Sequence, residues 1–211
     1  MNRLLIVICT LLITGCVGTG TRTVNNNVLI ATKPDFNVRI SSDFIHIGGE
    51  KYTDTKTSVS SSRNLRYLTN TDYFIINNGP TLEKVLTVAT KKIETYFVGN
   101  IFGGMKNPLL AGRINLGGKS YHYVATFYTP NMSNYTTRYL DDKGYVPPSR
   151  VIRFIAARVV GLNGDRLISF EYYENEETLI SFDKNINVWS TEQREYLDKA
   201  FDRFIKSFEV F

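Results

Sequence analysis

The sequence predicts an α+β fold, a twisted antiparallel β-sheet built from hairpins with a C-terminal amphipathic helix packed on one face. Three observations carry this prediction. Segments of alternating apolar and polar residues are joined by turn dipeptides such as Asn-Gly and Gly-Gly. Near the end of the chain, over residues 190–208, the apolar spacing changes from two residues to three and four. The chain is also rich in aromatic residues that suit a sheet, with 13 Tyr and 13 Phe.

The first predicted strand lies within residues 35–47, where apolar and polar side chains alternate over residues 36–40. Gly48-Gly49 ends this alternation. Residues 52–62 are polar and rich in Ser and Thr, and they indicate a loop or an edge strand.

The next two segments meet at Asn78-Gly79, a dipeptide typical of tight turns. Residues 65–77 before it carry bulky aromatic and branched side chains. Residues 82–98 after it are ambiguous, because the apolar spacing fits a helix whereas the many β-branched residues favour a strand. We favour a strand that pairs with residues 65–77, and the helix stays open as the alternative.

Two further hairpins are predicted after a glycine-rich loop at residues 99–110. Residues 111–129 turn at Gly117-Gly118, and residues 151–174 turn at Asn163-Gly164.

A long irregular stretch, residues 130–149, separates these two hairpins. Long loops often carry binding residues. Tyr135, Tyr139 and Tyr145 make this stretch our candidate partner-binding surface. The alternative, a packed connecting loop without a binding role, is at least as well supported.

The C-terminal helix has a start signal at Ser190, with Gln193 placed to complete a capping box. Its apolar stripe is wide enough to cover part of a sheet. The ending Phe204-Ile205-Lys206-Ser207-Phe208 resembles the close of PsbP-like domains, the family of the photosystem II extrinsic subunit. That resemblance implies an antiparallel sheet backed by a terminal helix, and it implies no activity.

The first residues form a leader, with Arg3 ahead of an apolar run at residues 4–13. The run is too short to span a bilayer, which takes about 20 apolar residues. Ile13-Thr14-Gly15-Cys16 then resembles the bacterial lipobox. In that family the cysteine receives a diacylglyceryl group, the chain is cut just before it, and the new amine is usually acylated. The resemblance implies a signal peptide over residues 1–15 and lipidation of Cys16.

Removal of the leader and the composition of the remaining residues predict how the rest of the chain is organised. Cys9 would be removed with the leader, so Cys16 would be the only thiol of the mature chain and serve as an anchor. Residues 16–34 are predicted to be a flexible tether, and residues 35–211 a single α+β globular domain. Val17 replaces the Asp that favours inner-membrane retention in enteric bacteria, so the resemblance implies an outer-membrane lipoprotein facing the periplasm.

The sequence offers no defensible catalytic or metal site. His46 and His122 lack a second histidine or cysteine at ligand spacing, and no Gly-x-Ser-x-Gly elbow or phosphate loop is present. We therefore expect no enzyme activity, no metal and no cofactor. Without Arg3 the chain has 24 Lys+Arg against 20 Asp+Glu, and no run of four basic residues, so we expect no nucleic acid partner.

The predicted function is that of a non-enzymatic binding or scaffolding module. The lipid on Cys16 would anchor it to the bacterial cell envelope, where it would bind an envelope protein. Two alternatives stay open. One is an envelope hydrolase with an unrecognised site, and the other is a carrier of an apolar ligand between membranes.

Overall fold

The computed structural model of the chain describes residues 20–57, 64–93, 102, 108–161, 164–175 and 189–211. The described part confirms an α+β class that is mostly antiparallel β-sheet, with one of its two helices near the C-terminus. The strands are β1 (Arg22–Asn25), β2 (Val28–Thr32), β3 (Asp35–Ile40), β4 (Ile45–Thr57), β5 (Asn64–Asn78), β6 (Thr81–Ile93), β7 (Leu110–Leu116), β8 (Lys119–Tyr128), β9 (Val151–Val160), β10 (Arg166–Asn175) and β11 (Phe208–Val210), and the helices are α2 (Tyr135–Asp142) and α3 (Thr191–Lys206).

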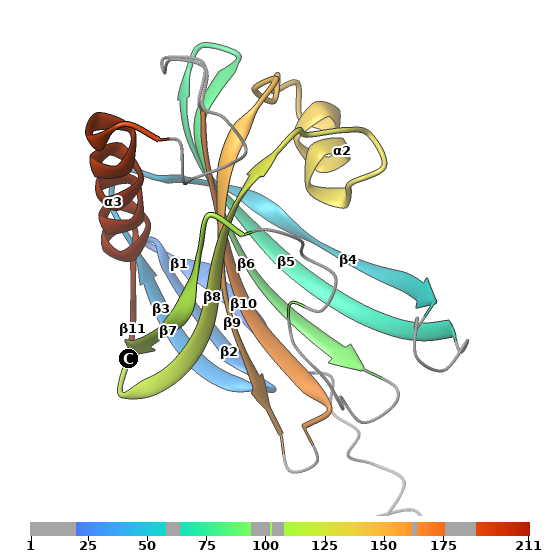
Figure 1. Ribbon diagram of the computed structural model, residues 1–211. Helices are drawn as coiled ribbons and strands as arrows, with labels where there is room; N and C mark the ends of the chain where they lie inside the picture. Colours follow the sequence, from blue (N-terminus) through green and yellow to red (C-terminus); the bar gives the residue numbers. More distant parts are fainter. Residues whose placement is uncertain (1–19, 58–63, 94–101, 103–107, 162–163, 176–188) are drawn as a thin grey trace, which may run out of the picture.

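The strands form two sheets where the sequence predicted one. A small sheet has the order β1-β2-β3-β11, and a large sheet has the order β4-β5-β6-β10-β9-β8-β7. Figure 1 shows the blue strands of the small sheet lying against one face of the large one. The main hydrophobic core contains buried residues of both sheets and of α3. A smaller cluster on the other face of the large sheet includes Leu140 of α2.

The predicted hairpins at the Asn-Gly and Gly-Gly turns are confirmed. Gly79 has a φ of +62° between β5 and β6, and Gly117 and Gly118 have φ values of +55° and +71° between β7 and β8. The ambiguous segment is a strand as far as Ile93, and residues 94–98 lie outside the described part. Strands β9 and β10 also pair as predicted, although Asn163 lies outside the described residues.

The predicted boundary of the tether is wrong for residues 22–32, which form β1 and β2. Asn26 and Asn27 adopt φ values of +47° and +58°, the conformation that a two-residue hairpin turn requires. The side-chain amide of Asn27 donates to the carbonyls of Ser41 and Phe44, at 3.1 and 2.8 Å. These contacts with distant backbone turn an apparently flexible Asn run into an ordered turn.

The predicted break at Gly48-Gly49 is an irregularity inside a strand. Strand β4 runs through both glycines, and its register with β5 shifts between His46 and Gly48. Gly48 has a φ of +113°, and a Cβ there would stand 2.7 Å from the hydroxyl of Tyr139. A glycine is therefore needed at this position both for its backbone conformation and for the close approach of α2.

Helix α2 forms within the stretch that was predicted to be irregular. Asn134 caps it by accepting a hydrogen bond from the backbone N–H of Thr137 at 3.3 Å. Only Thr137 and Leu140 of this helix are buried, so its apolar pattern is too sparse to be recognised in the sequence.

Helix α3 begins as predicted. The Ser190 hydroxyl accepts from the Gln193 backbone at 3.3 Å, and the Gln193 side chain accepts from the Ser190 backbone at 2.9 Å. The helix ends at Lys206, and the chain continues into β11, which pairs with β3. Neither described helix has the length and apolar character needed to cross a bilayer.

Candidate functional site

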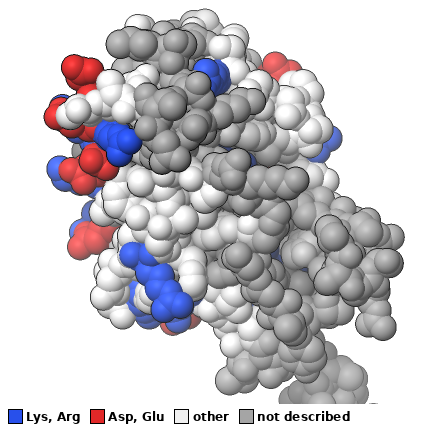
Figure 2. All heavy atoms as spheres, in the orientation of Figure 1, with Lys and Arg blue, Asp and Glu red and all other residues white. Residues whose placement is uncertain are grey.

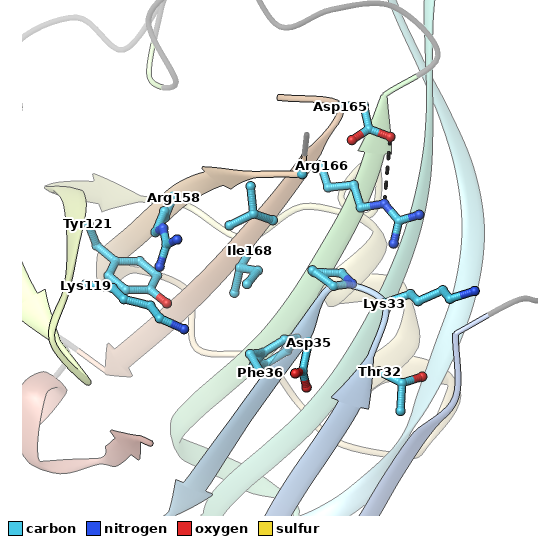
Figure 3. A pocket seen from close by; sticks show the side chains of 13 residues that line it. Thr32, Lys33, Asp35, Phe36, Lys119, Tyr121, Arg158, Asp165, Arg166 and Ile168 are labelled. Carbon is cyan, nitrogen blue, oxygen red and sulfur yellow. Dashed lines mark ion pairs between the residues drawn. The ribbon is translucent and has the colours of Figure 1, made fainter. Parts of the chain in front are cut away.

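A pocket of about 570 Å³ opens between the two sheets at the end where the β2–β3 turn faces the β9–β10 hairpin. Lys119, Tyr121 and Arg158 lie on one wall, and Asp35 and Phe36 lie on the opposite wall (Figure 3). The pocket therefore stands where the hydrophobic core ends and solvent begins.

The charged groups of this pocket are mostly cationic. Its lining has four basic side chains and two carboxylates, and one carboxylate, Asp165, lies 3.7 Å from the neighbouring Arg166. Exposed Asp35 is the only other acid in the described lining, which also contains Lys33, Lys119 and Arg158. The pocket keeps an excess of positive charge that attracts an anion.

Arg158 places a positive charge on the core face of the large sheet. It follows buried Phe154 and Ala156 at two-residue steps along β9, so it projects from the same face of the sheet, and it is only partly exposed. Its guanidinium carbon lies 6.0 Å from the ring centroid of Tyr121. Within the described residues neither Arg158 nor Lys119 takes part in an ion pair, so both are available to an anion.

The most buried part of the pocket lining is largely apolar. Phe36, Tyr121 and Ile168 belong to it and are 5%, 1% and 2% exposed. Burial raises the pKa of the Tyr121 hydroxyl, and the nearby guanidinium of Arg158 opposes that rise. Tyr121 thus stays a neutral hydroxyl at physiological pH, able to donate a hydrogen bond to an anion beside Arg158.

A second basic pocket of about 150 Å³ lies on the other side of the β2–β3 turn. The two pockets share Lys33, Pro34 and Arg166. No Asp or Glu is among the described residues that line the second one, whereas six basic residues are: Arg22, Lys33, Lys51, Lys91, Lys92 and Arg166.

The strand register joins the two pockets across the core face of the large sheet. One row of partners runs Lys51, Asn70, Thr90, Ile168 and Arg158, from β4 to β9. The next row sets Lys92 of β6 directly opposite Arg166 of β10. We call the two pockets and these rows the cationic trough, defined by Lys33, Lys51, Lys92, Lys119, Arg158 and Arg166.

The pairing of Lys92 with Arg166 is unfavourable on its own. Like charges directly opposite each other on neighbouring strands destabilise a sheet, because their Cβ atoms lie only about 5 Å apart. An anion bound between them would remove this repulsion.

Arg22 fastens the small sheet to the large one beside the trough. Its Nε donates to Asp72 at 2.9 Å, and its other nitrogens donate to Thr90 and to the Val88 carbonyl, both at 3.0 Å. Burial raises the pKa of the Asp72 carboxyl, but His46, 3.5 Å away, and Arg22 outweigh burial and hold it below its ordinary value of 3.8. Arg22 is thus engaged in the fold.

The three tyrosines predicted to bind a partner lie between α2 and the large sheet. The ring of Tyr135 stacks on Tyr52 with centroids 3.9 Å apart, and Tyr139 stacks on Tyr73 at 4.1 Å. Tyr145 packs against the smaller hydrophobic cluster. All three are partly exposed. Their contacts show how they hold α2, and their role in partner binding stays a prediction.

The two histidines lie on different strands. His46 on β4 faces Asp72, and exposed His122 on β8 is opposite Ala157 of β9. No group of three His, Cys, Asp or Glu side chains comes together as a metal site in the described part of the chain. Cys16, the predicted lipidation site, lies outside the described residues.

Glu174 is the most buried carboxylate among the described residues, and it links β10 to α3. It accepts hydrogen bonds from Tyr172 at 2.7 Å, from Tyr196 at 3.1 Å and from Arg203 at 2.6 Å. Burial and the carboxylate of Glu174 raise the pKa of both tyrosines above the ordinary value. These bonds satisfy the carboxylate, so it serves the fold.

Comparison with known proteins gives no relative for this chain: no family model, no curated protein and no solved structure matches it. The cationic trough therefore rests on its own geometry. The sequence does contain a sign of it, because Arg158 interrupts an apolar strand and Lys91-Lys92 ends another. The strand register that brings these residues together was not available from sequence.

Proposed function

We propose that this chain is a lipid-anchored, non-enzymatic binding module of the bacterial cell envelope that holds an anionic ligand in the cationic trough. The observation that carries the ligand assignment is Arg158, a partly buried arginine on the core face of β9 with no acidic partner among the described residues. Burying a charge without a partner costs free energy, and a bound anion offsets that cost.

The lining of the trough suits a ligand with a compact anionic group. A guanidinium makes strong, paired hydrogen bonds to phosphate or carboxylate oxygens, and lysines add point charges beside it. Lys119 and Arg158 lie on the same wall as the Tyr121 hydroxyl (Figure 3), so charge and a neutral donor converge on one place. The buried apolar side chains of Phe36 and Ile168 would contact a short apolar part of the same ligand.

The anchor and the body belong to the same proposal. The lipobox resemblance supports lipidation of Cys16 and display from the outer membrane toward the periplasm. The body would be a twisted sheet of hairpins that carries the amphipathic C-terminal helix on one face. Support for the helix position comes from Phe204, whose ring stacks on Phe154 with centroids 5.5 Å apart.

Lipid labelling tests the anchor. When cells that express the full chain are grown with a radioactive fatty acid, we expect the chain to become labelled. Cys16→Ala is expected to remove the label and release the chain from membranes. If the unlabelled variant still fractionates with membranes, the lipid on Cys16 is not what holds the protein there.

Titration calorimetry with inorganic pyrophosphate, a compact polyanion, tests the site. Arg158→Ala is expected to weaken binding at least tenfold, because charge-assisted hydrogen bonds contribute about 1.5–3 kcal/mol each. Arg158→Lys keeps the charge and should lose less. Arg39→Ala is the matched control, since Arg39 is exposed and pairs with Glu209 away from the trough. Equal affinities for all four proteins would refute the assignment.

A further inference from the structure

We infer that the trough end of the molecule docks on the bilayer, with the phosphates of anionic phospholipid headgroups seated in the trough. This inference rests on the proposed function, because it takes the anchored chain as its starting point and names the anion. It also fixes an orientation: the β2–β3 turn and the β9–β10 hairpin would face the membrane, and α3 would face away from it.

The start of the described chain lies at the trough itself. Gly20 lines the second basic pocket, next to Lys33 of the β2–β3 turn. Four residues of extended chain reach about 14 Å at most. A lipid on Cys16 would therefore hold this end of the body, and no other, close to the headgroups.

The charge distribution agrees with this orientation. The second pocket has six basic residues, of which Arg22 is paired with Asp72, and no acid in its described lining. Asp35 and Asp165 are the acids in the described lining of the first pocket. The exposed acids of α3 form a separate group: Glu192, Glu195, Asp198 and Asp202. Figure 1 places α3 away from the β9–β10 hairpin, and red and blue side chains lie together over α3 in Figure 2. Arg194, Lys199 and Lys206 are exposed on the same helix, so its surface charges nearly balance. An anionic surface would therefore attract the trough end more strongly than α3.

The form of the trough suits several phosphates at once. Its basic residues are spread from β2 to β10. The register sets four of them, Lys51, Lys92, Arg158 and Arg166, in two adjacent rows that run across the strands of the large sheet. A single small ligand would contact only some of these residues. A surface of phosphodiester groups, each with one negative charge, would reach both pockets together.

Vesicle sedimentation tests this inference on the chain from residue 16 onward carrying Cys16→Ala, which contains every described strand and helix but no lipid. We expect it to bind vesicles that contain phosphatidylglycerol and not vesicles of phosphatidylcholine alone. Binding should fall steeply as salt is raised, because screening shortens the range of the attraction to about 3 Å at 1 M.

Two matched triple variants locate the surface. Lys51→Ala with Lys92→Ala and Lys119→Ala removes three charges of the trough, and at least tenfold weaker binding to anionic vesicles is expected. Lys143→Ala with Lys199→Ala and Lys206→Ala removes three exposed lysines outside the trough, one at the C-cap of α2 and two in α3, and binding should be retained. Equal losses in both variants would overturn the inference.

The pyrophosphate titration separates this inference from the proposed function. A chain that binds pyrophosphate through Arg158 but ignores anionic vesicles would retain the anion site and refute membrane docking. A chain that binds neither would refute both. Vesicle binding that survives saturating pyrophosphate would also overturn the inference, because the headgroups would then occupy some other surface.

Discussion

Arg22 and Asp72 show how single side chains join the two sheets. They are 50 residues apart in the sequence, and both are largely buried, with side chains 15% and 13% exposed. Since Arg22 also donates to Thr90 and the Val88 carbonyl, it ties the N-terminal hairpin to two strands of the large sheet. Neither residue stands out in the sequence, because each is an isolated charge in a polar segment.

Removing Arg22 should be costly for the fold. Arg22→Ala leaves the Asp72 carboxylate buried without its main partner, and we expect the free energy of unfolding to fall by about 2–4 kcal/mol. Urea denaturation measures this. Arg39→Ala, which breaks an exposed pair with Glu209, should cost less than about 1 kcal/mol. Similar costs for the two variants would contradict the role given to Arg22.

The pair of Arg22 and Asp72 predicts that the stability of the fold depends on pH. The pKa of Asp72 is lower in the folded protein than its ordinary value of 3.8. Its ionised form therefore stabilises the fold above that pH, and the stabilisation is lost as pH falls through the folded pKa. The difference in unfolding free energy between the unaltered chain and Asp72→Asn should shrink between neutral pH and about pH 3. A constant difference over this range would show that Asp72 titrates normally.

At the scale of elements, local signals in the sequence predicted what local structure decides. The Asn-Gly and Gly-Gly turns, the strand after Gly79 and the Ser190 cap all appear where expected. The elements that were missed depend on distant contacts. The Asn26-Asn27 turn is fixed by the backbone of residues 41 and 44, and α2 is fixed by tyrosine stacking on β4 and β5.

Two substitutions in helix α3 test the distinction between local signals and distant contacts. Ser190→Ala removes the local cap and should cost about 1 kcal/mol. Phe204→Ala opens a cavity beneath the helix, where Phe204 is fully buried among Phe154 and Tyr172, and should cost about 3–5 kcal/mol. Thermal unfolding of both variants measures which substitution destabilises the protein more. A larger loss of stability for Ser190→Ala than for Phe204→Ala would contradict the expected order.

Glu174 tests the connection between α3 and β10. Glu174→Gln keeps the size of the side chain but removes the charge that Arg203 faces, so we expect a loss of about 1.5–3 kcal/mol. Arg203→Met in the same chain should recover part of that loss, because the buried charge is then gone from both sides. Additive losses in a double-mutant cycle would show that the two residues act independently.

At the scale of the whole molecule, the trough is a product of topology. Its residues come from the β2–β3 turn, from β4, β6 and β8, and from the β9–β10 pair, and no segment of the chain carries more than two of them. The sequence has a mild excess of basic residues, and these residues do not cluster along the linear chain. Only the order β4-β5-β6-β10-β9-β8 sets Lys92 opposite Arg166 and Arg158 in the adjacent row.

The most direct test of the trough as an anion site is Lys92→Glu, measured by urea unfolding with and without pyrophosphate. Without the anion the variant should be more stable by about 0.2–1 kcal/mol, because a repulsive pair with Arg166 becomes attractive. With pyrophosphate at 100 times its dissociation constant, the unaltered chain should gain about 2.7 kcal/mol, and the variant little or nothing. A variant that gains as much from pyrophosphate as the unaltered chain would contradict the account.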